Sequence, residues 1–198
     1  MTSTRGSRSL SNDPAIRGIF FVWRKAMTGF DLAFERVIGH EGGYGADPQD
    51  RGNWTTGIIG QGTLRGTKFG ISAMSYPDLD IKNLTLDQAK AIYKRDFWDR
   101  AKGDQYDPAI AYQLFDIAVN NGNGNAVRML QRAAGVADDG QVGALTIAAV
   151  KSLTVTDVIM RLNAERLLFI TKLSTWATYG KGWTNRVAGN LQYGAVDA

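Results

Sequence analysis

The chain has 198 residues, with 23 lysines and arginines against 19 aspartates and glutamates, and it contains no cysteine. The lack of cysteine excludes disulfide scaffolds, zinc-thiolate sites and thiol nucleophiles. With 44% hydrophobic residues the sequence can bury a core, which excludes a disordered chain. No apolar run approaches the roughly 18 residues of a membrane span.

The net charge of +4 is confined to one end of the chain. Residues 1–30 hold five basic residues and one acidic residue, whereas residues 31–198 hold 18 of each. We interpret residues 1–29 as a basic, flexible extension that makes at most weak contact with an anionic envelope. The electrically balanced remainder is not expected to bind nucleic acid.

The N-terminal third predicts one helix followed by a small β lobe. Hydrophobic residues recur at helical spacing over Phe30–His40, and Gly42 and Gly43 are expected to cap that helix. From Gly45 to Ile71, glycines alternate with Thr, Trp and Ile, which predicts a hairpin or small sheet on a loop-rich lobe.

The rest of the chain predicts helices. A capping box at Thr85–Gln88 opens a helix to about Arg100, and Asp107 with Pro108 begins a helix that should stop at Gly122. Further helices are expected at Asn125–Ala134, Ala144–Leu153, Thr156–Tyr179 and Trp183–Tyr193. No segment shows a parallel βαβ pattern, so the fold class is mainly α, a helical body with one small β-hairpin lobe near the N-terminus.

Glutamate is rare and occurs only as Glu35, Glu41 and Glu165. Glu35 and Glu165 each precede an arginine within a predicted helix, which is typical of solvated or ion-paired positions. Glu41 instead stands at the predicted helix end, before two glycines that leave room for a bulky substrate. The partial negative charge of a helix C-terminus favours the protonated carboxyl that a general acid needs. A plain cap is the alternative interpretation.

The next carboxylates are Asp47 and Asp50, the second of them nine residues after Glu41. A turn through Pro48 could bring Asp50 to face Glu41, and two carboxyls in unequal environments are the working groups of glycoside hydrolysis. Both aspartates could equally well serve only to build turns, which is a frequent use of aspartate. The residues alone leave both interpretations open.

Other polar and aromatic residues give weaker signals. His40 is the only histidine and has no partner as a metal ligand, so we predict no metal and expect His40 to pack or hydrogen-bond beside Glu41. We also predict no cofactor. Asn120 and Asn121 form either a turn between helices or contacts to N-acetyl sugars. The tryptophans are expected mostly in the core, with one or two of them stacking on sugar rings.

Several segments, in chain order, resemble glycoside hydrolase family 108, a family of phage and bacterial N-acetylmuramidases that are commonly endolysins. The catalytic signature is carried by His40–Tyr44, Asp47–Gly52 and Thr67–Ser72. The family's peptidoglycan-binding-like half and terminal motif are carried by Phe115–Asn120, Leu130–Arg132, Asp139–Gly143 and Gly182–Arg186. The resemblance covers about residues 28–194.

This resemblance implies a lysozyme-like α+β fold in which residues 30–198 form a single catalytic domain. Residues 30–106 would be the catalytic half with the β lobe, and residues 107–198 the helical, peptidoglycan-binding-like half. The resemblance further implies that Glu41 is the essential acid. As candidate substrate-binding residues we name His40, Tyr44, Asp47, Trp54, Asn120 and Asn121.

The resemblance leaves three threonines in competition for one role. Phage-type lysozymes, a broader group of relatives, share a Glu-x8-Asp-x5-Thr pattern that Glu41, Asp50 and Thr56 match. The family pattern instead places a threonine just before a Gly-Ile pair, and Thr67 matches it if about a dozen residues after Trp54 are an insertion. Thr55 is the third candidate. The chosen threonine would position a water or hydrogen-bond the sugar beside Asp50.

The implied function is hydrolysis of the β-1,4 bond between N-acetylmuramic acid and N-acetylglucosamine in peptidoglycan glycan strands. The enzyme would be a monomeric endolysin, made in the cytoplasm of a bacterial host and reaching periplasmic peptidoglycan after holin-type release. A lytic transglycosylase and a non-catalytic peptidoglycan-binding module are the alternatives.

Overall fold

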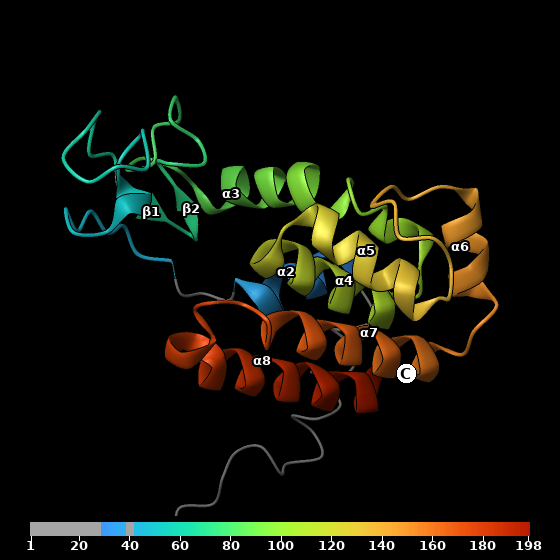
Figure 1. Ribbon diagram of the computed structural model, residues 1–198. Coiled ribbons are helices and arrows are strands. Elements are labelled where there is room, and N and C mark those ends of the chain that lie inside the picture. The colour runs from blue at the N-terminus through green and yellow to red at the C-terminus, as the bar shows by residue number, and fades with distance from the viewer. Residues whose placement is uncertain (1–28, 39–41) are drawn as a thin grey trace, which may run out of the picture.

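The structure is a computed structural model, and it describes residues 29–38 and 42–198. Its helices are α2 (Gly29–Val37), α3 (Leu86–Tyr93), α4 (Pro108–Asn121), α5 (Asn123–Ala133), α6 (Ala144–Lys151), α7 (Val155–Ile170) and α8 (Trp176–Asp197). Two short antiparallel strands, β1 (Thr67–Lys68) and β2 (Ile71–Ser72), form the sheet. The helices stack into one body, and the sheet lies in a loop-rich lobe at one end (Figure 1). The predicted mainly α, lysozyme-like class is confirmed.

Helix α4 is the centre of the body. Every residue from Ala109 to Ala118 is buried, and α2, α5, α7 and α8 all pack against this helix. Its start follows the prediction, since Asp107 accepts a hydrogen bond from the amide of Ala109 at 2.9 Å and Pro108 occupies the first helical position. It ends at Gly122, whose φ of 84° closes the helix.

Aromatic rings join α2 to the core. The ring of Phe30 lies 5.5 Å from that of Trp98 and 5.8 Å from that of Phe115, both edge-on. Phe34 packs in the same way on Tyr93 at 5.7 Å. Edge-to-face aromatic pairs are favourable beyond the area that they bury, so this cluster fixes α2 against α3 and α4.

Helix α3 begins as predicted and ends differently. Thr85 accepts from the amide of Gln88 at 3.2 Å while the Gln88 side chain accepts from the amide of Thr85 at 2.9 Å, so the capping box is confirmed. After Tyr93 the chain continues as one wider turn of π-helix over Lys94–Trp98. That turn places Trp98 in the core, where its Nε1 donates to Asp104 at 2.8 Å.

The predicted C-terminal end of the first helix is wrong. The first helix ends at Val37 and not at His40, because Val37, Ile38 and Gly39 all have low helix propensity. Gly42 and Gly43 lie outside any helix or strand and do not cap it. The placement of Glu41 at a helix end therefore loses its basis, since helix-end charge acts only within the last turn.

The long helix predicted at Thr156–Tyr179 is in fact broken, and the short one predicted at Trp183–Tyr193 is the middle of a longer one. Helix α7 stops at Ile170, and a turn rich in Thr and Ser precedes α8. Hydroxyl side chains compete with helical hydrogen bonds, which explains the break. Gly180 does not interrupt α8, because the indole of Trp176 fills the space where its side chain would stand.

A buried carboxylate joins α4 to the last two helices. Asp116 is 1% exposed, and its Oδ2 accepts from Arg166 at 2.6 Å and from Asn190 at 2.8 Å. Its Oδ1 accepts from Nε and Nη2 of Arg186 at 2.8 and 2.6 Å. Burial alone would raise the pKa of Asp116, but the hydrogen bonds and charges of Arg186 and Arg166 hold it below its ordinary value. The two motifs that contain Asp116 and Arg186 therefore meet in the core.

A second polar cluster shapes the loop before α6. Buried Gln131 donates to Oδ1 of Asp139 at 2.7 Å and to the carbonyl of Gln141 at 3.0 Å, and accepts from the amide of Gly140 at 2.8 Å. Asp139 also accepts from the amide of Gln141 at 2.8 Å. The motifs around Gln131 and Asp139 thus bind each other and have a structural role.

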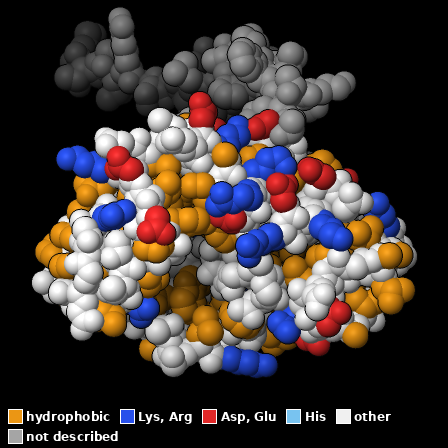
Figure 2. Space-filling view, turned by 90° about the horizontal axis from the view of Figure 1, so that it is seen from above, with side chains coloured by type: hydrophobic (Ala, Val, Ile, Leu, Met, Phe, Trp, Pro, Cys, Tyr) orange, Lys and Arg blue, Asp and Glu red, His pale blue; other side chains and the backbone are white. Residues whose placement is uncertain are grey.

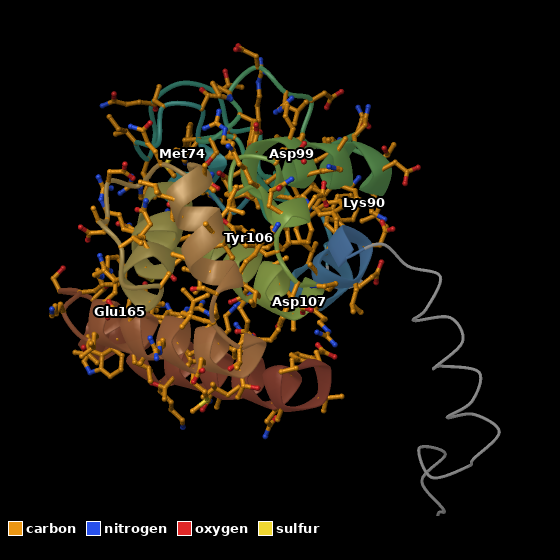
Figure 3. All side chains as sticks on the ribbon, turned by 90° about the vertical axis from the view of Figure 1, so that its right-hand side faces the viewer. Met74, Lys90, Asp99, Tyr106, Asp107 and Glu165 are labelled. Atoms are coloured by element: carbon orange, nitrogen blue, oxygen red, sulfur yellow. The ribbon has the colours of Figure 1, made fainter. Side chains whose placement is uncertain are left out.

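The outer surface mixes charges of both signs. Figure 2 looks down on the face that carries the β lobe and α3, and shows basic and acidic side chains interspersed around a hollow with hydrophobic walls. Figure 3 shows the β lobe, with Met74, and α7, with Glu165, on opposite sides of the body. Within the described residues, no helix has both the length and the apolar character required to cross a bilayer.

We predict that Asp116→Asn lowers the free energy of unfolding by about 3–5 kcal/mol, because it leaves the guanidinium of Arg166 buried without its charged partner. The matched control is Asp99→Asn, which breaks an ion pair with Lys94 at 2.6 Å in which both side chains are about half exposed. That change should cost less than about 1 kcal/mol. Denaturant titration measures both, and equal losses would contradict the role given to Asp116.

The same pair predicts a pH dependence. Because the folded-state pKa of Asp116 is lowered, its contribution is fully present above the unfolded-state pKa of about 3.9 and is lost as pH falls through the folded-state value. The difference in unfolding free energy between the parent and Asp116→Asn should therefore be constant above about pH 5 and narrow below about pH 4.

Candidate functional site

Two predicted site residues, His40 and Glu41, lie outside the described residues. We therefore define the candidate site by the contacts of the segment that begins at Gly42. The carbonyl of Gly42 accepts from the amide of Phe69, in the turn between β1 and β2, at 3.4 Å. A Cβ on Gly42 would stand 2.1 Å from the Phe69 ring. The segment that follows Glu41 in the sequence is thus packed directly against the β turn, and only glycine allows that approach.

The β turn itself is held firmly. Phe69 has a φ of 51°, an unfavourable left-handed conformation for a bulky residue, and its carbonyl accepts from the hydroxyl of Tyr93 at 3.0 Å. Burial raises the pKa of Tyr93 to about 12, and the nearby charge of Arg186 opposes that rise. Tyr93 therefore remains a neutral hydrogen-bond donor at physiological pH, and it links the turn to the helical body.

Thr67 lies beside the segment that follows Glu41. Thr67 and Gly45 exchange two backbone hydrogen bonds of 2.8 and 2.9 Å. The hydroxyl of Thr67 donates to Oδ1 of Asn53 at 2.8 Å, and Nδ2 of Asn53 donates to the carbonyl of Asp47 at 3.0 Å. Asn53 is 3% exposed, and it joins three parts of the lobe that are distant in sequence.

Asp50 is the N-cap of a short 3₁₀ helix, Arg51–Asn53. Its Oδ1 accepts from the amide of Gly52 at 2.8 Å, and among the described residues its Oδ2 accepts no hydrogen bond. Asp47 accepts from the amide of Gln49 at 2.9 Å. Both aspartates build turns, as one of the two interpretations predicted. For Asp50 the turn orients the carboxyl and leaves one oxygen exposed for chemistry.

The other two threonines are used within their own loop. The hydroxyl of Thr56 donates to the carbonyl of Gln61 at 2.8 Å, and that of Thr55 accepts from the amide of Thr63 at 3.0 Å. A bridge between Trp54 and Leu64 closes the loop at its base. The structure therefore brings Thr67, and neither Thr55 nor Thr56, together with Asn53 and the turn of Asp50.

The predicted substrate-binding residues of the lobe differ in their exposure. Trp54 is half-buried, and its Nε1 donates to the carbonyl of Pro48 at 2.9 Å. Tyr44 is 40% exposed and lines a hollow of about 390 Å³ with Arg65 and Lys82. A groove of about 560 Å³ runs between residues 75–79 and α3. The hollow at Tyr44 adjoins the candidate site, since the next residue is bonded to Thr67.

The asparagine run forms the turn between α4 and α5. Asn120 donates to the carbonyl of Asp116, one turn back in its own helix, at 2.7 Å. Asn123 donates to the carbonyl of Asp96 at 2.7 Å and so attaches this turn to the π-helical segment. Within the described chain, the buried Oδ1 atoms of Asn121 and Asn123 have no hydrogen-bond partner.

Sequence reasoning missed the residues that hold the site together. Asn53, Phe69 and Tyr93 carry no chemistry of their own and were not candidates. One feature of the sequence does point to a structural role for Asn53: it ends a short turn that Asp50 caps and that Trp54 follows. Its partner Thr67 is 14 positions away, a distance that no local pattern reveals.

A helical body with a small β lobe, in which a turn-building aspartate and a threonine adjoin the segment after a glutamate, defines a lysozyme-like glycoside hydrolase. The family model described as glycosyl hydrolase 108 matches residues 34–122. The solved structure of SagA from Brucella abortus aligns with a TM-score of 0.70 and 31% identity, covering 85% of this chain and 94% of SagA. No curated protein matches the chain. The chain belongs to glycoside hydrolase family 108, and its substrate is accordingly peptidoglycan.

We predict opposite outcomes for the two neighbouring glycines. Gly42→Ala places a methyl group inside the Phe69 ring, so it should cost about 1–3 kcal/mol of stability and reduce hydrolysis of peptidoglycan. Gly43→Ala, with no atom within 4 Å of its added Cβ, is the matched control and should leave both unchanged. Thermal unfolding and a turbidity assay measure the effects. Equal behaviour of the two variants would refute the packing of Gly42 on the β turn.

Proposed function

We propose that the chain is an N-acetylmuramidase, which hydrolyses the β-1,4 bond between N-acetylmuramic acid and N-acetylglucosamine. Glu41 protonates the leaving glycosidic oxygen, and a water molecule supplies the hydroxyl group to the anomeric carbon. The assignment of Glu41 rests on its place in the family signature. The structural support is the packing of the next residue, Gly42, on the turn of β1 and β2.

Asp50 is the second carboxyl of the proposed mechanism. It lies on the protein surface, and the amide of Gly52 fixes one oxygen at 2.8 Å. The carboxylate either activates the attacking water or stabilises the oxocarbenium-like transition state. The anomeric configuration of the first product distinguishes the two, because a direct attack by water inverts it and a two-step displacement retains it.

Thr67 is the threonine that assists Asp50, and its geometry is the observation that carries the proposal. The two backbone hydrogen bonds to Gly45 hold it beside the segment after Glu41, and its hydroxyl is oriented by Asn53. The hydroxyl donates its proton to Asn53, so its oxygen lone pairs can accept from a water or a sugar hydroxyl beside Asp50. Thr56 lacks this position, since its hydroxyl closes a loop of its own.

The α4–α5 turn offers a second contact to the substrate. Asn120 is exposed there, and its side-chain amide is the proposed partner of the N-acetyl groups of the sugars. We also propose that residues 30–198 act as one domain, since α2 from the first half packs on α4 from the second.

The biological role that we propose is that of a phage endolysin. The enzyme would act as a monomer on periplasmic peptidoglycan after holin-type release from the host cytoplasm. Support for this comes from the sequence motifs shared with family 108, many of whose members are endolysins. Lysis of host cells on co-expression with a holin, and no lysis without it, is the expected result.

We predict that Glu41→Gln abolishes the loss of turbidity of purified peptidoglycan and that Asp50→Asn reduces its rate at least 100-fold, with thermal midpoints nearly unchanged. Thr67→Val should reduce the rate about tenfold or more, whereas the matched variant Thr56→Val should stay within about twofold of the parent. Retained lysis by Glu41→Gln, or a larger loss for Thr56→Val than for Thr67→Val, would refute the assignment.

The products test the bond that is cleaved. Mass spectrometry of the released muropeptides should show reducing N-acetylmuramic acid ends. Anhydro-muramyl ends would instead identify a lytic transglycosylase, which needs no water-activating aspartate. Binding to cell walls without release of any reducing sugar would identify a non-catalytic module, and either outcome would overturn the muramidase proposal.

A further inference from the structure

The first two turns of α8 carry an aromatic cluster made of Trp176, Tyr179 and Trp183. The ring of Trp183 lies 5.8 Å from that of Tyr179 and 6.4 Å from that of Trp176. Gly180 makes this arrangement possible, since a Cβ there would stand 2.7 Å from the Trp176 indole. The three rings therefore form a continuous aromatic surface along one side of the helix.

This aromatic cluster lies outside the hydrophobic core. Tyr179 is 56% exposed, and Trp176 and Trp183 are only partly buried. Neither tryptophan belongs to the partly buried hydrophobic residues that pack against the core, such as Phe169 and Leu191. Yet Trp183 falls at helical spacing with Val187, which is buried further along α8. The apolar face of α8 thus continues past the end of the core as an aromatic surface.

The chain around the cluster is polar and carries no acidic group. Residues 166–196 contain four basic residues and neither aspartate nor glutamate. Arg166 and Arg186 bind Asp116, so the exposed basic side chains beside the rings are those of Lys172 and Lys181. Exposed polar side chains flank the rings, namely those of Thr171, Lys172, Ser174, Thr175, Thr178, Lys181, Thr184 and Asn185. Aromatic faces, hydroxyl and amide hydrogen-bonding groups and a positive charge together match a polysaccharide that bears carboxylates.

A chain of contacts leads from the cluster to the candidate active site. Arg186, one turn after Trp183, binds Asp116 and lies close enough to Tyr93 for its charge to act there. Tyr93 in turn donates to Phe69, which packs against Gly42. Figure 1 shows the start of α8 at the end of the molecule where the β lobe lies. The start of α8, which carries the aromatic cluster, is therefore linked to the candidate site through Arg186 and Tyr93.

We infer that Trp176, Tyr179 and Trp183 form a stacking surface for the glycan strand of peptidoglycan. The C–H faces of the sugar rings pack on the aromatic faces, and their hydroxyl groups bond to the polar side chains alongside. Lys172 and Lys181 attract the carboxylates of the peptide stems. The inference rests on the proposed function for its substrate, and it extends the binding surface beyond the bond that is cleaved.

The test uses the full chain with Glu41→Gln, so that binding is measured without cleavage. Co-sedimentation with purified sacculi gives a dissociation constant for this parent and for variants at Tyr179 and Trp183. Tyr179→Ser and Trp183→Ala should each weaken binding roughly five- to tenfold, as removal of one stacking partner does. Tyr179→Phe keeps the ring and should bind like the parent.

The matched control is Leu145→Ala, which removes a side chain 82% exposed on α6 and should leave binding unchanged. Because Tyr179 is exposed, its serine variant should keep the parent's thermal midpoint, which separates a binding defect from unfolding. Glycan strands stripped of peptide by an amidase should show the same loss. A loss confined to peptide-bearing sacculi would mean that the rings contact the stems, and would overturn stacking on sugars.

The inference and the proposed function can fail separately. Anhydro-muramyl products together with weakened binding by Tyr179→Ser would refute the muramidase and keep the stacking surface. Binding by Tyr179→Ser and Trp183→Ala equal to that of the parent would refute the stacking surface, whatever the products are. A parent dimer that Tyr179→Ser converts to a monomer with unchanged affinity for sacculi would show a contact between copies instead.

Discussion

The fold depends on one buried carboxylate. Asp116 lies in the central helix and binds Arg166 of α7 and Arg186 of α8 at once, so it fixes both helices against α4. A buried ion pair contributes little net stability, because removing the charges from water offsets most of their attraction. Its effect is on specificity, since any other register of α8 would leave a guanidinium or a carboxylate unpaired. Arg186 is also the basic group next to Tyr93, so the position of α8 is set relative to the site.

The β lobe obtains its rigidity in a different way. Its sheet has only two residues in each strand, too little to be stable alone, and its hydrophobic content is small. Hydrogen bonds from side chains replace the sheet, with Asn53 joining the hydroxyl of Thr67 to the backbone carbonyl of Asp47. Such bonds hold individual loop residues to within a fraction of an ångström, which a hydrolase needs for the groups that flank the scissile bond.

The parts of the fold that depend on residues adjacent in the sequence could be predicted from short sequence patterns. The capping box at Thr85 and the start and end of α4 were predictable, because each rests on a few adjacent residues. The break before α8 was not, since hydroxyl side chains such as those of Thr171 and Ser174 also occur within helices and do not by themselves mark an end. The candidate carboxylate Asp50 was predictable from spacing. The choice among the threonines required the pairing of Thr67 with Gly45, a contact across 22 residues.

Net charge was the least informative of the sequence properties, for a physical reason. The body after residue 30 is balanced, which argued against nucleic acid as a partner. Charged partners respond to the local field, however, and that field decays within about 8–10 Å at physiological ionic strength. A balanced total therefore permits a stretch such as residues 171–185, in which the only charged residues are Lys172 and Lys181. In this chain that stretch coincides with the aromatic surface of α8, so the charge and the shape of the surface favour the same anionic polysaccharide.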